Sequence, residues 1–395
     1  MGISPSRIFK RWKMKTVYLD NGATSYPKAP NVGKAMADYI TENGANVNRG
    51  TYKSAGSAAM TVLDTREMLS ELFHFPGKET HVVFTPGHTY GLNQILRGFL
   101  KSGDHVIVSS MEHNAVMRPV IELSERGVEF SRIPADLAGR TKAEDIIPLI
   151  KENTKLVMVN HASNVSGTVF PLEKVAEICL ERNIPLAVDA AQTAGHRDID
   201  FEKLHLAALS VPGHKGLLGS QGIGALLLDK AFAEKLTPLT TGGTGSASDS
   251  EYQPMFMPDR FESGTVNIPG IFGLHAALEF VLKTGVESFG AHEADLTERF
   301  IEGIKDLPIR IAGPCDTREQ VGVVSVDFLG NDNGEIAYKL EQKGIMTRCG
   351  LHCAPNAHKT LGTFPQGTVR FSFGYATTEE EIDYAISAIK ELVRK

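Results

Sequence analysis

Lys215 stands in a stretch, SVPGHKGLLGSQG, where packing does not require a lysine. It follows His214 and lies between a short apolar run and a glycine-rich turn. A lysine amine can form an imine with an aldehyde cofactor. A single lysine is more often a solvated surface charge, so the polar residues elsewhere in the chain must decide between the two interpretations.

Four further polar residues each follow a short apolar run. They supply an aromatic ring, two amides and an acid, at His113, Asn164, Asp189 and Gln192. Taken singly, each is as readily a core histidine, a turn residue or a helix cap. Together with Lys215 they suit pyridoxal phosphate, because that cofactor acts as an electron sink when an acid holds the proton on its ring nitrogen.

This chemistry assigns a part of the cofactor to each side chain. Asp189 would face the ring nitrogen, Gln192 would face the phenolic oxygen, and His113 would stack on the ring. The segment VVFTPGHTYGLNQIL predicts a strand, a glycine turn and a helix. Backbone N–H groups and a hydroxyl at the start of this helix, from Gly87, His88 and Thr89, suit a phosphate group.

Short apolar runs alternate with segments of helical periodicity up to about residue 230. Strands separated by helices predict an α/β fold with a mostly parallel sheet covered on both faces. Ligands of such sheets lie beyond the carboxyl ends of the strands, where the polar residues above are found. The expected strands are 81–85, 105–110, 155–160, 184–189, 206–211 and 223–228.

The order of elements changes after about residue 270, where a long helical stretch precedes two strands and two helices. This order is typical of a separate α+β domain. We expect its strands at 322–328 and 368–373 and its helices near 334–344 and from 378. The predicted division is an N-terminal arm at 1–30, with 1–13 as a disordered extension, a large cofactor-binding domain at 31–270 and a small C-terminal domain at 271–395.

Composition limits the classes of function. The chain has 395 residues, 42% of them hydrophobic, and a net charge of −6, which argues against a nucleic-acid-binding surface. Four scattered cysteines favour a reducing cytoplasm over a disulfide framework. No apolar run is long enough to span a membrane, so no membrane partner is expected. The opening MGISPS fits a myristoylation pattern only loosely, so we favour a disordered extension, with Met14 as an alternative start.

Nearly the whole chain, from VYLDNGATSYPK to TVRFSFGYATTEEEID, resembles a known family. It is similar to the class V aminotransferase family of fold type I pyridoxal phosphate enzymes, and within that family to the cysteine desulfurases. The matching motifs occur in order, as EHNAV, VDAAQTAGH, GHKGLLGSQG, RFESGTVN and RCGLHCAP.

The resemblance implies a role for each matching residue. Lys215 would hold the cofactor covalently, and Arg370 would clamp the α-carboxylate of the substrate. Asn164 and Gln192 would bond the phenolic oxygen, Asn164 would also contact the substrate, and His113 would also move protons. Phosphate ligands would be His214, Thr89 and the backbone at His88, together with Gly264 and Thr265 of the neighbouring subunit. The last two imply a homodimer with shared sites.

The chain departs from the family pattern at one phosphate position. Many members have serine three residues before the lysine, whereas this chain has Pro212. The hydroxyl donor is lost there, which puts the affinity for the cofactor in doubt.

Cys353, in TRCGLHCAPNAHKTLG, matches the nucleophile of the desulfurases. The resemblance implies that its thiolate attacks the sulfur of L-cysteine, leaving alanine and a persulfide. Cationic neighbours such as His352 or Arg348 would favour the thiolate. Cys349 is unusual for the family; we favour a small apolar loop residue over a sulfur acceptor or a disulfide partner of Cys353.

Three interpretations of function remain open. The first is a cysteine desulfurase with a sulfur-acceptor protein as partner, or a selenocysteine lyase. The second is another reaction of the same family, transamination or elimination, against which Cys353 argues. The third is a binding protein without activity, against which the complete set of Lys215, Asp189, His113 and Arg370 argues. Cys179 and Cys315 are expected to be structural.

Overall fold

The computed structural model describes residues 16–47 and 52–393. The extension and the myristoylation pattern considered above therefore lie outside the described residues. Within the described part, no helix is both long and apolar enough to cross a membrane.

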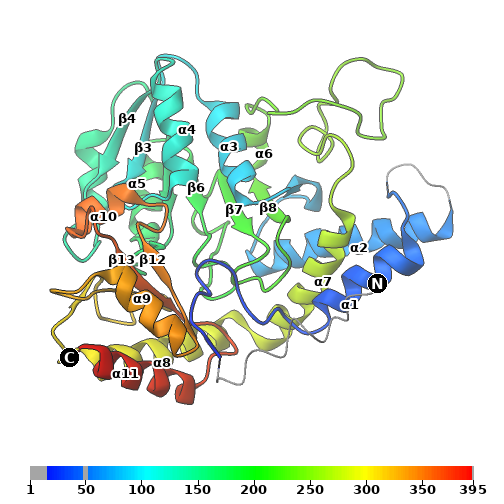
Figure 1. The fold of residues 1–395 in the computed structure, drawn as a ribbon. Helices are drawn as coiled ribbons and strands as arrows, with labels where there is room; N and C mark the ends of the chain where they lie inside the picture. Colours follow the sequence, from blue (N-terminus) through cyan, green and yellow to red (C-terminus); the bar gives the residue numbers. More distant parts are fainter. Residues whose placement is uncertain (1–15, 48–51, 394–395) are drawn as a thin grey trace.

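A seven-stranded sheet forms the centre of the fold (Figure 1). Its strand order is β2-β8-β7-β6-β5-β3-β4, and only β8 runs antiparallel to its neighbours. The prediction of an α/β fold with a mostly parallel sheet is confirmed. The strands are β2 (Val82–Thr85), β3 (His105–Ser109), β4 (Glu129–Ile133), β5 (Thr154–Asn160), β6 (Leu186–Asp189), β7 (Ala208–Pro212) and β8 (Gly224–Leu228).

Two features of this sheet differ from the expectation. The edge strand β4 was not predicted, because its sequence EFSRI is mostly exposed or half-buried and lacks a continuous apolar run. β8 is antiparallel to β7 because only residues 213–223 join them, and a parallel connection needs a crossover of a dozen or more residues.

Helices cover both faces of the sheet (Figure 1). Successive residues of β3 point to opposite faces: Val106 and Val108 belong to one apolar cluster and Ile107 to the other. Helices of the first cluster are α3 (His88–Phe99), α4 (Asn114–Ser124) and α6 (Lys230–Ala233). Those of the second are α1 (Val32–Asp38), α2 (Lys53–Leu72), α5 (Leu172–Glu181) and α7 (Ile268–Thr284).

The C-terminal part contains a four-stranded antiparallel sheet in the order β12-β13-β10-β9. Its apolar residues form a cluster of their own with the long helices α8 and α11. The expected elements at 322–328, 334–344, 368–373 and 378 onward are present as β10, α9, β13 and α11. The division into domains stays a prediction. The elements are α8 (Val286–Ile304), β9 (Arg310–Ile311), β10 (Val323–Asp327), α9 (Asn333–Gln342), β12 (Arg348–Gly350), α10 (Pro355–Leu361), β13 (Thr368–Ser372) and α11 (Glu379–Val393).

The N-terminal segment connects the two sheets. β1 (Val17–Tyr18) pairs with β11 (Ile345–Met346) in the C-terminal part. Further along, the backbone N–H of Ser25 donates to the carbonyl of His214, at 3.0 Å, beside the central sheet. This segment therefore contacts both parts of the chain.

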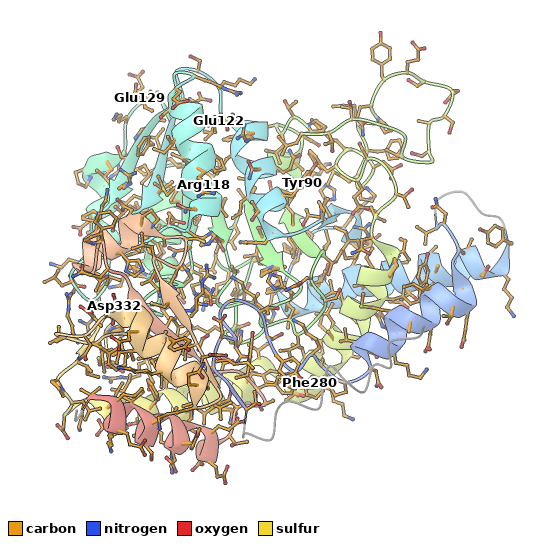
Figure 2. All side chains as sticks on the ribbon, viewed as in Figure 1. Tyr90, Arg118, Glu122, Glu129, Phe280 and Asp332 are labelled. Carbon is orange, nitrogen blue, oxygen red and sulfur yellow. The ribbon has the colours of Figure 1, made fainter. Side chains whose placement is uncertain are left out.

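Ion pairs also connect neighbouring helices at the surface. Figure 2 labels Glu122 and Arg118 on α4. The Glu122 carboxylate pairs with Arg97 of α3 and, at 2.7 Å, with Arg126. Pairs of this exposed kind contribute little to stability.

A buried ion pair holds the segment before α7 against the central sheet. Arg66 on α2 and Glu262 pair at 2.8 Å with both side chains only 7% exposed. Glu262 also accepts a hydrogen bond of 2.6 Å from the backbone N–H of Phe84 in β2.

We predict that Glu262→Gln lowers the free energy of unfolding by about 3 kcal/mol, because it leaves the Arg66 charge buried without a counter-ion. Denaturant unfolding measures the change. Asp383→Asn, which removes one partner of the exposed Arg299, is the control and should cost less than about 1 kcal/mol. Equal losses in the two variants would contradict this account.

Candidate active site

The carboxyl ends of four parallel strands meet at one edge of the central sheet. His113 is the N-cap of α4 after β3, and Asn164 follows β5. Asp189 ends β6, and Lys215 follows β7. Because β3, β5, β6 and β7 are parallel neighbours in the sheet, the residues at their carboxyl ends lie at the same edge.

Lys215 lies in a small cavity that Gln192, Asn21 and Gly22 also line. The pKa of its amine is lowered from 10.5 to about 8, chiefly by burial; the charge of Asp189 opposes this shift and that of Arg370 adds to it. The amine is therefore neutral, and nucleophilic, at much lower pH than an ordinary lysine.

Asp189 stays ionised although it is buried. Burial opposes the charge, but the neighbouring His88 and the backbone N–H of Ala191 together lower the pKa of the carboxyl to about 2. His88 Nε2 lies 2.7 Å from Asp189 Oδ1, and its Nδ1 lies 2.9 Å from the Ser210 hydroxyl. The side chain of His88 thus holds the acid in place, a role that the sequence did not suggest.

His113 is a neutral imidazole. Burial lowers its pKa to about 4. Its Nδ1 accepts a hydrogen bond of 3.0 Å from the backbone N–H of Ala115, so the ring proton is assigned to Nε2.

Arg370 is buried, not a surface charge on a strand. It is 1% exposed, and its Nη2 lies 2.7 Å from Asp20 Oδ1. Its Nη1 donates to the Asn164 carbonyl at 3.1 Å, while Nε has no hydrogen-bond partner among the described residues. Two of the five N–H donors of the guanidinium are thus used, and that of Nε is among those left for another acceptor.

Asn164 joins the sheet edge to the loop that carries Cys353. Its amide Nδ2 donates to the carbonyl of His352 at 2.7 Å. Its Oδ1 is buried and has no partner in the described part of the chain. The backbone N–H of Asn114 adds a second link, at 2.7 Å to the Cys353 carbonyl.

The N-terminal arm also contributes to this site, although no single residue of the arm indicated such a role in the sequence. Besides Asp20, the carbonyl of Gly22 accepts from Gln192 Nε2 at 3.1 Å. The carbonyl of His214 accepts a hydrogen bond from Lys28 Nζ at 2.8 Å, and Nδ1 of the His214 ring lies 3.0 Å from the Thr24 hydroxyl. The only signal in the sequence was the motif VYLDNGATSYPK, which identified the family but no role for these residues.

The expected phosphate ligands are only partly gathered. Thr89 is exposed in the first turn of α3, after Gly87, whose φ of 154° suits glycine. Gly264 and Thr265 are exposed between α6 and α7 and do not line the cavity of Lys215. Pro212 ends β7 and brings no hydroxyl. These ligand roles stay predictions.

Cys353 is exposed in the loop between β12 and α10. His352 and Cys353 have φ values of 48° and 58°, the left-handed region that non-glycine residues seldom adopt. Arg348 Nη2 lies 3.3 Å from Cys353 Sγ. The cation beside the thiol is therefore Arg348.

His352 does not act as a cation here, contrary to one of the two expectations. Its ring is buried, and Nε2 lies 3.0 Å from the Thr368 hydroxyl. Burial lowers its pKa to about 2, so the ring is neutral.

Cys349 lies on the other face of the small sheet. In the register of β12 and β13, Arg348 is opposite Arg370 and Cys349 is opposite Val369. Since neighbouring residues of a strand point to opposite faces, the Cys349 thiol points away from the Arg348–Cys353 contact. Burial and Asp332 also raise its pKa, which makes it a poor thiolate. These observations argue against a disulfide with Cys353 or a sulfur relay. Cys349 is nevertheless exposed, and it lies in β12 and not in a loop as expected.

The remaining cysteines differ in setting. Cys179 is buried in α5, and burial raises its pKa to about 12, as a structural cysteine requires. Cys315 is exposed, so its surroundings give no packing reason for a structural role.

Glu112, from the motif EHNAV, is buried next to the sheet edge and binds the ends of two strands. Its Oε1 accepts from the Ser109 hydroxyl, at 2.5 Å, and from the backbone N–H of Asn160, at 2.9 Å. Burial raises its pKa to about 8. The residue thus links the ends of β3 and β5 next to His113.

Comparison with known proteins identifies the family. Residues 17–385 match the family model described as Aminotransferase class-V. A probable cysteine desulfurase of Pyrococcus abyssi is 33% identical over 387 residues, covering 96% of this chain and 95% of that protein. The cysteine desulfurase IscS of Clostridium botulinum is 29% identical over 96% of this chain and 95% of its own length.

A solved structure shows the same fold. The apo structure of the cysteine desulfurase from Thermococcus onnurineus NA1 has a TM-score of 0.90 and 32% sequence identity, and the match covers 96% of this chain and 95% of that one. With a family model that matches almost from end to end, and a site built at the expected sheet edge, the chain belongs to the aminotransferase class-V family.

Proposed function

We propose that this protein is a pyridoxal phosphate-dependent cysteine desulfurase that converts L-cysteine to L-alanine and takes the sulfur onto Cys353 as a persulfide. The observation that carries the proposal is the exposed Cys353 with the Arg348 guanidinium 3.3 Å from its sulfur. Arg348 donates to this sulfur and so holds the side chain of Cys353 in a defined position in its loop. The names of the relatives in Pyrococcus abyssi and Clostridium botulinum support the same reaction.

The residues at the sheet edge fit pyridoxal phosphate. Lys215 offers a neutral amine for the cofactor aldehyde, and the ionised Asp189 suits a protonated ring nitrogen. The buried Asn164 Oδ1, which has no partner in the described chain, suits a polar group of a ligand. Further ligands would be His113, Gln192, His214, Thr89 and the backbone of His88, with Gly264 and Thr265 from the neighbouring subunit of a homodimer. When bound, the cofactor supplies an electron sink for the carbon next to the amino group.

The side chains of this protein then divide the work. Arg370 binds the substrate carboxylate through the N–H groups of its guanidinium that are still free, among them that of Nε, which has no partner among the described residues. The neutral amine of Lys215 removes and returns the proton at the α-carbon. The proton on His113 Nε2 is available for donation to a group that forms next to this imidazole. The Cys353 thiolate attacks the substrate sulfur, forming an S–S bond. The carbon–sulfur bond breaks, and its electron pair stays on the β-carbon, which becomes the methyl group of alanine after protonation.

Other reactions of the family would not use the thiol of Cys353. Transamination and elimination need no thiol beside the substrate, and they leave Cys353 and Arg348 without a role. A selenocysteine lyase would share the remaining machinery. Because Cys353 is exposed, a sulfur-acceptor protein can approach its persulfide. A cytoplasmic location, expected from the scarcity of cysteines, agrees with a free reactive thiol.

We predict that Cys353→Ala abolishes the release of both sulfide and alanine from L-cysteine in the presence of a reductant, with at least a hundredfold loss of rate. The cofactor should still bind, because Cys353 makes no contact with Lys215 or Asp189 among the hydrogen bonds of the site. Cys349→Ser is the matched control and should retain most of the activity. Sulfide release that survives Cys353→Ala would favour elimination instead.

A second prediction concerns pH. Only the neutral amine attacks an aldehyde, and the pKa of Lys215 is lowered to about 8. The rate at which the apoprotein captures pyridoxal phosphate covalently should therefore rise with pH and level off above about pH 8, as followed by cofactor absorbance. Lys215→Ala gives the background. A rate that keeps rising up to the ordinary lysine pKa of 10.5 would contradict the lowered pKa.

A further inference from the structure

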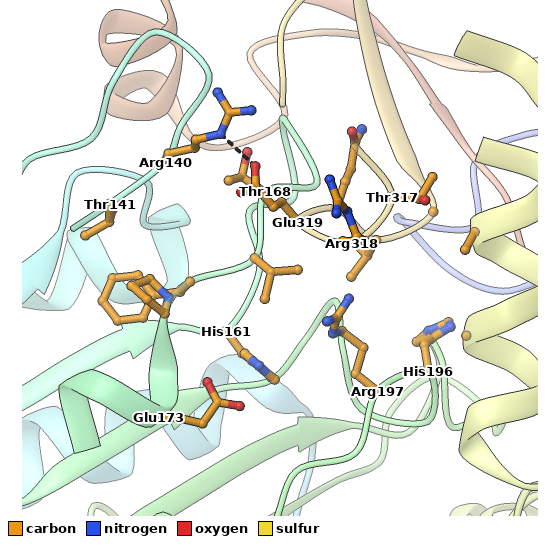
Figure 3. A pocket seen from close by; sticks show the side chains of 18 of the residues that line it. Arg140, Thr141, His161, Thr168, Glu173, His196, Arg197, Thr317, Arg318 and Glu319 are labelled. Atoms are coloured by element: carbon orange, nitrogen blue, oxygen red, sulfur yellow. Dashed lines mark hydrogen bonds and ion pairs between the residues drawn. The ribbon is translucent and has the colours of Figure 1, made fainter. Parts of the chain in front are cut away.

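A second, larger cavity of about 890 Å³, drawn in Figure 3, adjoins the cavity of Lys215. Its lining includes neither Lys215, Cys353 nor Arg370. His196 lines both this cavity and that of Lys215, so the two share a wall. Nε2 of His196 lies 2.0 Å from where a Cβ on Gly216 would be, so the wall packs directly on the residue after Lys215. The lining comes from the segments 134–145, 168–173, 196–198, 287–294 and 317–322 and from His161.

Several charged groups of the lining are already paired. Arg140 Nε lies 2.7 Å from Glu319 Oε2, the contact dashed in Figure 3. His196 Nδ1 lies 2.6 Å from Glu293 Oε1. Arg318 is held by Asp316 next to it. These groups do not need a ligand.

Arg197 and Glu173 are different. Neither has a hydrogen bond or ion pair through its side chain with the rest of the described chain. Burial lowers the pKa of the half-buried Arg197, and the charge of Glu173 opposes that shift, so the two side chains interact electrostatically. They nevertheless form no ion pair within 4.0 Å. In Figure 3 the His161 ring lies between them. The lining also includes Lys142, Asp145 and Glu287, which form no ion pair with other residues that the structure describes.

Neutral polar groups complete the lining. His161 is buried and uncharged, since burial lowers its pKa to about 3, and its Nδ1 lies 3.1 Å from the Thr193 hydroxyl. The Thr141 hydroxyl and Gln320 Oε1 are buried without a partner among the described residues. Gln320 is only 3% exposed. Buried polar atoms without partners are uncommon in proteins and call for an acceptor or donor from outside.

We propose that this cavity binds a small zwitterion of the α-amino acid type, with its carboxylate on Arg197 and its ammonium group on Glu173. Two opposite charges that face one cavity without touching are bridged by a ligand that carries both charges. An anion bound to Arg197 would place its negative charge near Glu173, which would stay without a partner. A cation bound to Glu173 would likewise place its positive charge near an unpartnered Arg197. The site is distinct from that of the substrate, whose carboxylate we assign to Arg370, and it does not depend on the proposed reaction.

The test uses the cofactor-loaded enzyme and a ligand that cannot react with the cofactor. N,N-Dimethylglycine is suitable, because its tertiary amine forms no imine with an aldehyde. Titration calorimetry measures its binding, and unchanged cofactor absorbance shows that the Lys215 site is not involved. The probe 3-methylbutanoate has the same shape but lacks the ammonium charge.

We expect N,N-dimethylglycine to bind the parent protein at least tenfold more tightly than 3-methylbutanoate. Arg197→Gln and Glu173→Gln should each weaken its binding at least tenfold. Arg318→Gln, which removes a cation of the same cavity that already has a partner, should leave the affinity unchanged.

Three results would overturn the proposal: no binding to the parent, equal binding by Arg197→Gln and the parent, or equal binding of the two probes. The last would indicate a site for anions only. If Arg197→Gln does not fold, Glu173→Gln decides alone, since Glu173 is exposed on α5 and its replacement does not threaten the core.

Discussion

The site depends on a buried ion pair that joins three distant parts of the chain. Arg370 on β13 pairs with Asp20 of the N-terminal arm at 2.7 Å and donates to the carbonyl of Asn164, which follows β5. A guanidinium that is 1% exposed would be very costly without such partners. The pair therefore holds the arm, the small sheet and the large sheet in one arrangement, and it keeps part of the guanidinium available.

Burial also sets the protonation states on which the chemistry relies. It lowers the pKa of Lys215 to about 8, so that the amine loses its proton around that pH, and it makes His113 a neutral imidazole, while His88 keeps Asp189 ionised against the same effect. One environment thus provides a nucleophile, a ring with an assigned proton and a fixed negative charge. Enzymes commonly tune pKa values apart in this way to perform acid and base steps at one pH.

Much of the fold could be predicted from the local pattern of residues. Six of the seven strands of the large sheet have continuous apolar runs, because both faces of the sheet are buried, and all six were expected close to their positions. The exception is β4, an edge strand whose exposed residues carry no such pattern. The reversed direction of β8 follows from its short connection to β7, a feature of chain length that periodicity does not report.

The sequence by itself determined which chemical groups are present: the lysine, the acid, the histidine and the cysteine, placed at or after the ends of strands, and the arginine within a strand, in motifs whose order identifies the family. Tertiary structure decided which groups touch. Only the folded chain brings Asp20 to Arg370, the His88 side chain to Asp189, and Arg348 instead of His352 to the Cys353 sulfur. The physical reason is that charge and hydrogen-bonding partners are set by distance and burial in space, and residues 350 positions apart in sequence carry no local mark of their contact.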